Sequence, residues 1–212
     1  MKNKITLKSQ FVKTAMCVAL AFSASASHAT PIVLNNAGFE ASSIGTNYHY
    51  LSDRTFDGWY FAGNAGLAGN NSGFNVANAA GNSAAFLQQG GSSISQEFTF
   101  AGGYLSIDFL AESRSGYGGN LIQVAINDQL LTFNGVNSIL PSTSSTFSQY
   151  QTDFIGLAAG NYTLKFIGTD SSRDVTTFID NVAINAVPEP GSLALFAVGA
   201  LAAAGLRRRR RA

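Results

Sequence analysis

Acidic side chains are the most numerous groups in this chain that could do chemistry. All twelve Asp and Glu residues lie between residues 30 and 206, where only four basic residues accompany them, so this segment carries a formal charge of −8. The other basic residues are four lysines before residue 14 and five arginines at 207–211. An acidic domain repels phosphate backbones, so we expect no nucleic-acid partner. Its carboxylates would instead suit divalent cations.

A catalytic centre is difficult to assemble from these acids. Glycosidases use two carboxylates at a fixed separation, and Asp108 with Glu112 or Asp170 with Asp174 would be such pairs. A chain with twelve acids offers many pairs, however, and spacing along the sequence does not give spacing across a sheet. The sequence has no Gly-x-Ser-x-Gly or His-Glu-x-x-His motif. We therefore predict a protein that is not an enzyme, with a secreted carbohydrate-active hydrolase or lyase as the alternative.

Aromatic side chains beside small polar residues could bind the faces of sugar rings. Tyr48 and Tyr50 flank His49, and Tyr117 stands among glycines at 116–119, in segments that we expect to be loops. Trp59, the sole tryptophan, follows a glycine. We predict glycan contacts for these three tyrosines and Trp59, with turn or core roles as the alternative.

The N-terminus has the three parts of a secretory signal peptide. A basic segment up to Lys13 precedes an apolar run at 14–22, and Ser27-His28-Ala29 places small residues where signal peptidase cleaves. We predict a signal peptide at 1–29, cut between Ala29 and Thr30. The sole cysteine, Cys17, lies inside it, so disulfides and thiol chemistry are excluded from the mature domain.

The C-terminus also has three parts in order. Pro188-Glu189-Pro190 precedes an apolar segment at 191–206, and the arginine run follows. The wholly apolar stretch of 14 residues would cover only ~21 Å as a helix, which is short for a permanent membrane anchor. The arginines should stay in the cytoplasm. A transient transmembrane helix is the prediction, and a permanent tail anchor holding a domain on the periplasmic face is the alternative.

This C-terminal arrangement resembles the PEP-CTERM sorting signal. The resemblance implies that an exosortase, a membrane-embedded transpeptidase-like cysteine protease, recognises Pro188-Glu189-Pro190, cleaves nearby and transfers the protein to the cell surface or exopolysaccharide. It also implies export across the inner membrane of a Gram-negative-type bacterium, with signal peptidase as the second processing partner.

Short runs with a period of two fill the segment between these ends. Residues 104–111 place Leu105, Ile107 and Phe109 on one face, and similar patterns occupy 31–34, 55–61, 84–88, 93–100, 122–126, 130–133, 160–167 and 175–184. Residues 62–82 predict a long loop with one short strand near 74–76. The pattern predicts an all-β fold, an antiparallel jelly-roll β-sandwich spanning 30–186, with the sorting signal at 187–212.

The first and last strands of this domain carry a further resemblance. Asn35-Asn36-Ala37-Gly38-Phe39-Glu40 with Gly58-Trp59, and Phe178-Ile179-Asp180-Asn181-Val182, resemble the opening and closing strands of galactose-binding-like jelly rolls, including carbohydrate-binding modules. The resemblance implies a structural calcium ion held by the Gly38 carbonyl and by the Glu40 and Asp180 carboxylates, and a core position for the tryptophan. Without a cation, Asp180 would accept backbone hydrogen bonds and Glu40 would be solvated.

These observations predict an exported protein at the cell surface or in the exopolysaccharide matrix, anchored only transiently in the inner membrane. Its role should be non-catalytic, either structural or glycan-binding, with extracellular polysaccharide as partner. Calcium is the one cofactor expected.

Overall fold

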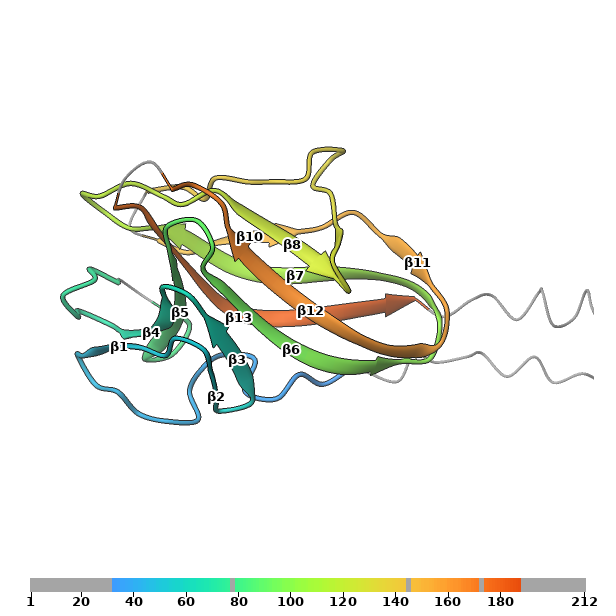
Figure 1. The fold of residues 1–212 in the computed structure, drawn as a ribbon, viewed down its shortest axis with the longest axis horizontal. Helices are drawn as coiled ribbons and strands as arrows, with labels where there is room; N and C mark the ends of the chain where they lie inside the picture. The colour runs from blue at the N-terminus through green and yellow to red at the C-terminus, as the bar shows by residue number, and fades with distance from the viewer. Residues whose placement is uncertain (1–31, 77–78, 144–145, 172–173, 188–212) are drawn as a thin grey trace, which may run out of the picture.

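The computed structural model describes residues 32–76, 79–143, 146–171 and 174–187 (Figure 1). The predicted signal peptide with Ala29 and Thr30, the Pro188-Glu189-Pro190 motif, the apolar segment and the arginine tail lie outside these residues. In the described part of the chain, no helix has the length and apolar character needed to cross a membrane.

Thirteen strands account for the regular structure of the described residues. They are β1 (Tyr48–Tyr50), β2 (Arg54–Phe56), β3 (Trp59–Ala62), β4 (Ala65–Gly69), β5 (Ser83–Gln88), β6 (Ser93–Phe100), β7 (Gly103–Ser113), β8 (Ile122–Ile126), β9 (Gln129–Leu130), β10 (Ser148–Gln151), β11 (Ile155–Leu157), β12 (Gly160–Gly168) and β13 (Thr176–Val187). All their pairings are antiparallel.

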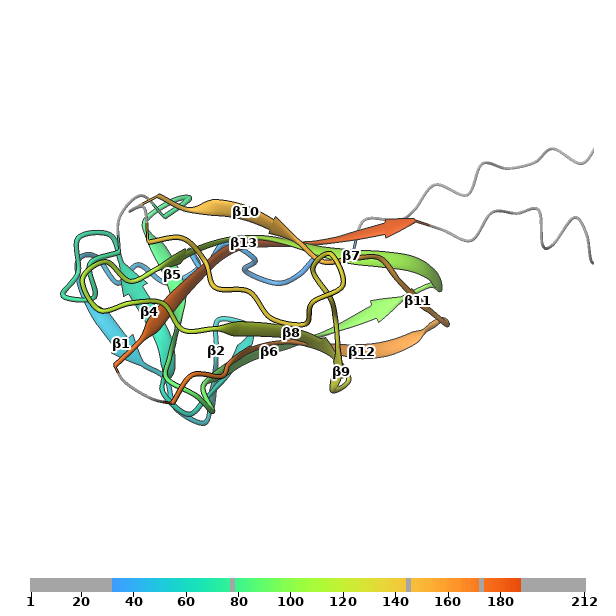
Figure 2. The same ribbon diagram turned by 90° about the horizontal axis from the view of Figure 1, so that it is seen from above.

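The strands form two sheets that pack face to face (Figure 2). Sheet A has the order β1-β4-β5-β13-β7-β10, with β11 also paired to β7, and sheet B has the order β2-β3-β6-β12-β8-β9. The chain passes repeatedly from one sheet to the other, for example from β5 to β6 and from β6 to β7, as jelly-roll connectivity requires. The predicted all-β antiparallel sandwich is confirmed.

The main core lies between the two sheets. Leu105, Ile107 and Phe109 of β7 point inward, as their alternation predicts, and meet Leu164 and Phe166 of β12. Phe109 and Phe166 contact each other edge to face, with ring centroids 5.0 Å apart. The inward row therefore supplies the apolar burial that holds the sheets together.

A second apolar cluster lies on the outer face of sheet A. It contains Ala68, Phe74, Val76, Ala79, Ala84, Phe86 and Phe178. Phe86 of β5 and Phe178 of β13 are register partners that point away from the main core, and Phe74 of the β4–β5 connection covers them. We call residues 70–76 and 79–82 the covering loop.

Several predicted elements differ from the structure. Residues 65–69 are strand β4 rather than loop, and 74–76 belong to the covering loop rather than to a strand. A Cβ at Gly66 would overlap the His49 carbonyl oxygen, so β1 and β4 need a glycine there to approach each other. The single strand expected at 55–61 is a hairpin, because Asp57 (φ 49°) and Gly58 (φ 88°) form a tight turn. Strands β1, β10 and β11 were not expected.

Candidate functional site

Three of the four residues predicted to contact glycans gather at one end of sheet A. Tyr48 and Tyr50 lie two residues apart on edge strand β1 and share a face, with ring centroids 6.2 Å apart at 85°. Tyr117 lies in the connection after β7. The three side chains are 45%, 42% and 49% exposed, so each presents part of its ring to solvent. Such partly exposed rings are well suited to contact a ligand face.

Buried rings beneath β1 fix the orientation of the two tyrosines. Phe74 of the covering loop lies 4.5 Å from Tyr48 and 5.9 Å from Tyr50, measured between ring centroids. Phe86 lies 5.1 Å from Tyr50 at 87°. Because Phe74 and Phe86 are almost fully buried, the tyrosines rest on a packed support rather than on a mobile loop.

Arg114 connects Tyr117 to this support. Its guanidinium carbon lies 3.8 Å from the Tyr117 ring centroid and 4.4 Å from that of Phe74. The Nε and Nη2 groups donate to the carbonyl oxygens of Phe74 and Gly73, each over 3.1 Å. We call Tyr48, Tyr50, Phe74, Arg114 and Tyr117 the tyrosine platform. Sequence reasoning missed Arg114, although it is one of four basic residues in the acidic domain.

Polar groups border the platform. Asp174 lies 3.8 Å from Arg114 Nη1 and accepts a 2.5 Å hydrogen bond from Gln88 Nε2. The Tyr50 hydroxyl donates to Gln88 Oε1. Burial, and next the negative charge of Asp174, raise the pKa of Tyr50. Tyr50 therefore remains a hydrogen-bond donor, and the half-exposed Asp174 carboxylate can accept from a ligand hydroxyl.

The two acid pairs considered for catalysis lie in different parts of the fold. Asp108 and Glu112 are four residues apart on β7, so their backbones lie about 13 Å apart at ~3.3 Å per residue. In the second pair, Asp174 is held by Gln88 and Arg114.

The structure corrects the prediction of a glycan contact by Trp59. Its side chain is 0% exposed, its ring lies 5.1 Å from that of Phe39, and its Nε1 group donates to the Asn36 carbonyl over 3.0 Å. A side chain enclosed in the main core cannot reach a ligand. Trp59 is therefore a core residue, which is the role that the sequence predicts as the alternative to a glycan contact.

Gly38, Glu40 and Asp180 meet at the other end of the covering loop. The Asp180 carboxylate is fully buried, and a Cβ at Gly38 would lie 3.8 Å from its Oδ1 atom. Asp180 accepts hydrogen bonds of 2.7 Å from the backbone N–H groups of Ala80 and Asn181. Burial raises the pKa of Asp180 to about 7, and the charge of Glu40 contributes to this rise.

Glu40 binds the residues that follow Ala80. Its Oε1 atom accepts from the backbone N–H groups of Asn82 and Ser83 over 2.7 and 2.8 Å. Two carboxylates and the Gly38 backbone are thus brought together, and hard oxygens of this kind fit calcium. Across the described ranges, no three His, Cys, Asp or Glu side chains are grouped as a metal site would need. A calcium ion here would therefore need carbonyl oxygens beside the two carboxylates.

The resemblance of the C-terminus to the PEP-CTERM sorting signal is confirmed by comparison with known families. Residues 186–211 match the family described as "PEP-CTERM protein-sorting motif". No curated protein matches the chain in sequence.

Solved structures of carbohydrate-binding modules resemble the chain in fold. The module TmCBM61, solved with β-1,4-galactotriose, has a TM-score of 0.51 and 16% sequence identity to this chain. The match covers 74% of this chain and 100% of the module. The CBM22-1 xylan-binding domain of Xyn10C from Paenibacillus barcinonensis has a TM-score of 0.45 and 11% sequence identity. This match covers 70% of the present chain and 99% of the xylan-binding domain. At 16% identity the likeness to TmCBM61 shows the fold alone: a curled antiparallel sandwich of the carbohydrate-binding-module type.

Proposed function

We propose that this protein is exported, processed at its C-terminal signal by an exosortase, and retained at the cell surface or in the exopolysaccharide, where its sandwich binds a glycan without catalysis. Signal peptidase and exosortase are its processing partners, the inner membrane holds it only transiently, and nucleic acid is not a partner. The tyrosine platform, on a chain that ends in a PEP-CTERM motif, is the observation that carries this proposal.

The platform has the parts that sugar recognition needs. Tyr48, Tyr50 and Tyr117 offer exposed ring faces for the apolar side of a sugar ring. The Asp174 carboxylate and the Tyr50 hydroxyl oxygen lie beside them, and both can accept from sugar hydroxyls. A few oriented polar groups among apolar rings are the usual composition of a small-ligand site. The proposed role therefore follows from side chains already held in place before binding.

Calcium is proposed as a structural ion rather than a reactant. Glu40 and Asp180 would hold it together with the Gly38 carbonyl, and it would supply positive charge to two carboxylates that otherwise repel each other. The same two side chains hold the backbone of residues 80–83. The proposed effect of calcium is thus to keep the covering loop, and with it Phe74, in place.

The binding proposal is tested on the mature secreted protein with β-1,4-galactotriose and xylotriose as probes. We expect saturable shifts in the backbone resonances of Arg114 and Tyr117, and we expect these shifts to be lost when Tyr48 and Tyr50 are both replaced by alanine. Tyr104→Ala is the matched control, because Tyr104 is an exposed tyrosine at the opposite end of sheet A. Equal loss of these shifts in the control, or their retention in the double variant, would contradict the proposed site. Matrix retention without saturable binding would favour a purely structural role.

The sorting proposal is tested by the mass and location of the mature protein. Replacing Pro188, Glu189 and Pro190 by alanine should leave the arginine tail attached and the protein in the inner membrane, whereas the intact form should lose both ends and reach the surface fraction. If both forms keep their C-termini, the chain is a permanently tail-anchored domain, and the surface role is wrong.

A further inference from the structure

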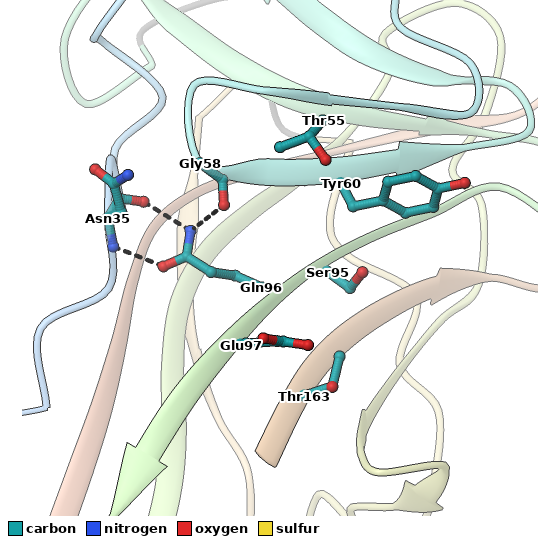
Figure 3. A pocket seen from close by; sticks show the side chains of 8 residues that line it. All are labelled: Asn35, Thr55, Gly58, Tyr60, Ser95, Gln96, Glu97 and Thr163. Carbon is teal, nitrogen blue, oxygen red and sulfur yellow. Dashed lines mark hydrogen bonds between the residues drawn. The ribbon is translucent and has the colours of Figure 1, made fainter. Parts of the chain in front are cut away.

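The outer face of sheet B carries a groove that the proposed function does not use (Figure 3). Its volume is about 540 Å³, within the range of cavities that hold small ligands. Thr55 of β2, Tyr60 of β3, Ser95 and Glu97 of β6 and Thr163 of β12 line it. The four strands that contribute are neighbours in sheet B, so the groove follows from the sheet itself.

Strand register explains why this surface is polar. Tyr60 is the register partner of Ser95, and Glu97 is the partner of Thr163, so these side chains lie in two adjacent rows. Their neighbours along the strands, such as Phe61 and Ile94, point into the main core. The period-two pattern that builds the core therefore also builds the outward polar row.

One end of the groove is fixed by Gln96. Its Nε2 group donates to the carbonyl oxygens of Asn35 and Gly58 over 2.8 and 2.9 Å, and its Oε1 atom accepts from the Asn35 N–H over 2.6 Å. Gly58 has a φ of 88°, and a Cβ there would come within 2.5 Å of the Asn35 side-chain nitrogen. The wall is therefore already shaped in the absence of a ligand, which lowers the entropy lost on binding.

The lining defines the chemistry that would be bound. Tyr60, 44% exposed, offers a flat ring, and three hydroxyl groups and one carboxylate surround it. No described residue that lines the groove is cationic. Lys165, the register partner of Ser95, points its ammonium group toward Asp128 at 3.4 Å. This composition suits a ligand with several hydroxyl groups and disfavours an anionic one, because Glu97 would repel it.

We propose that this groove is a second saccharide-binding site, for an uncharged sugar segment, and that the domain joins two polysaccharide chains. Tyr60 would stack on the sugar, and Glu97 would accept from neighbouring hydroxyls. The groove and the tyrosine platform lie on the outer faces of different sheets, so one short segment cannot fill both. Two sites on one rigid body raise the avidity for a polymer and cross-link separate chains. The cross-linking part rests on the proposed function of the platform.

The groove is tested by titrating the mature protein with cellotriose, xylotriose and β-1,4-galactotriose while following the backbone resonances of Ser95 and Thr163. Binding should persist in the Tyr48→Ala, Tyr50→Ala double variant and disappear in the Tyr60→Ala, Glu97→Gln double variant. Thr99→Ala is the control, because Thr99 is exposed on β6 but does not line the groove. If these resonances do not shift with any of the three sugars up to about 10 mM, the second site is excluded, even where the platform binds.

Cross-linking is tested with xylan and galactan. The native protein should raise the viscosity of the polysaccharide that it binds, whereas each double variant should bind without raising it. Binding in the groove without binding on the platform would overturn the proposed platform and the cross-linking but leave the groove site standing. Undiminished cross-linking by the Tyr60→Ala, Glu97→Gln variant would overturn the proposal that two saccharide sites on one domain join the chains.

Discussion

The outer faces of the two sheets have opposite chemistry. Sheet A presents Phe86 and Phe178, which would be costly to leave in water, whereas sheet B presents the polar side chains that line the groove. The apolar face is covered by Phe74 of the covering loop, and the polar face stays open. The proposed site on sheet A therefore depends on a loop that must be held in place, whereas the proposed site on sheet B depends only on strand register.

The covering loop is held at three places. Arg114 binds the carbonyl oxygens of residues 73 and 74, and Glu40 and Asp180 bind the N–H groups of residues 80, 82 and 83. Asn70 joins the two ends of the loop, because its side chain accepts a hydrogen bond from the Ala79 N–H and donates one to the Gly81 carbonyl. These contacts convert a long glycine- and asparagine-rich segment into a fixed support for the tyrosines.

Removing a ring beneath the loop should have the largest effect. Phe86→Ala takes away a buried ring whose centroid lies 4.6 Å from that of Phe74, so we expect a loss of about 3–5 kcal/mol in the free energy of unfolding. Tyr60→Ala on sheet B is the matched variant and should cost about 0.5 kcal/mol or less. Chemical denaturation measures both. Similar losses would mean that the second apolar cluster does not stabilise the fold.

The acid pair should make the stability of sheet A depend on pH and calcium. The pKa of Asp180 is raised to about 7, so between the usual carboxyl value and about 7 the folded state holds a proton that the unfolded chain releases. With chelator present, the free energy of unfolding should therefore fall as pH rises through this window, by on the order of 4 kcal/mol. Calcium should remove the fall, because the cation replaces the proton.

Asp180→Asn separates this effect from general acid or base sensitivity. The variant should lose both the pH dependence and the calcium response, whereas Asp128→Asn, at an exposed turn, should keep both. Thermal unfolding at several pH values, with calcium and with chelator, gives the comparison. A calcium response that survives in Asp180→Asn would place the ion elsewhere.

The strands of the sandwich could be predicted because their signal is local. Residues 93–100 and 160–167 alternate apolar and polar side chains, and they coincide with β6 and nearly all of β12. The Asp57-Gly58 turn shows the limit of such reasoning, because its positive φ values split one predicted strand into a hairpin. Strand β4 was missed since its alanines and glycines carry no β propensity, and its place depends on a close approach to β1.

The candidate site could be predicted only in part for a related reason. Exposed tyrosines among small residues can be noticed in a sequence, but their gathering cannot, because Tyr50 and Tyr117 meet through Phe74 and Arg114 on other elements. Arg114 and Phe74 are 40 residues apart. Trp59 had the right chemistry for sugar stacking, and only its burial excludes it.

Arg114 should contribute more to stability than any exposed ion pair. Arg114→Ala removes one buried and one partly buried hydrogen bond from a charged donor and leaves two carbonyl groups without that partner, so we expect a loss of about 2–3 kcal/mol and weaker glycan binding. Lys165→Ala, which removes the exposed pair with Asp128, should cost about 1 kcal/mol or less. Denaturation and sugar titration of both variants check this. A small loss in Arg114→Ala would show that the loop is held without it.

Tyr117→Ala should have the smallest effect on stability and a clear effect on binding. The ring is half exposed and covers one side of the Arg114 guanidinium, and an exposed contact of this kind contributes about 0.5–1 kcal/mol. Because Phe74 still packs on the other side of Arg114, the covering loop should stay in place. Sugar affinity should nevertheless fall several-fold, since one of three ring faces is lost, while Tyr104→Ala should leave it unchanged. A stability loss as large as that of Arg114→Ala would instead make Tyr117 part of the support, and the ligand face would then consist of β1 alone.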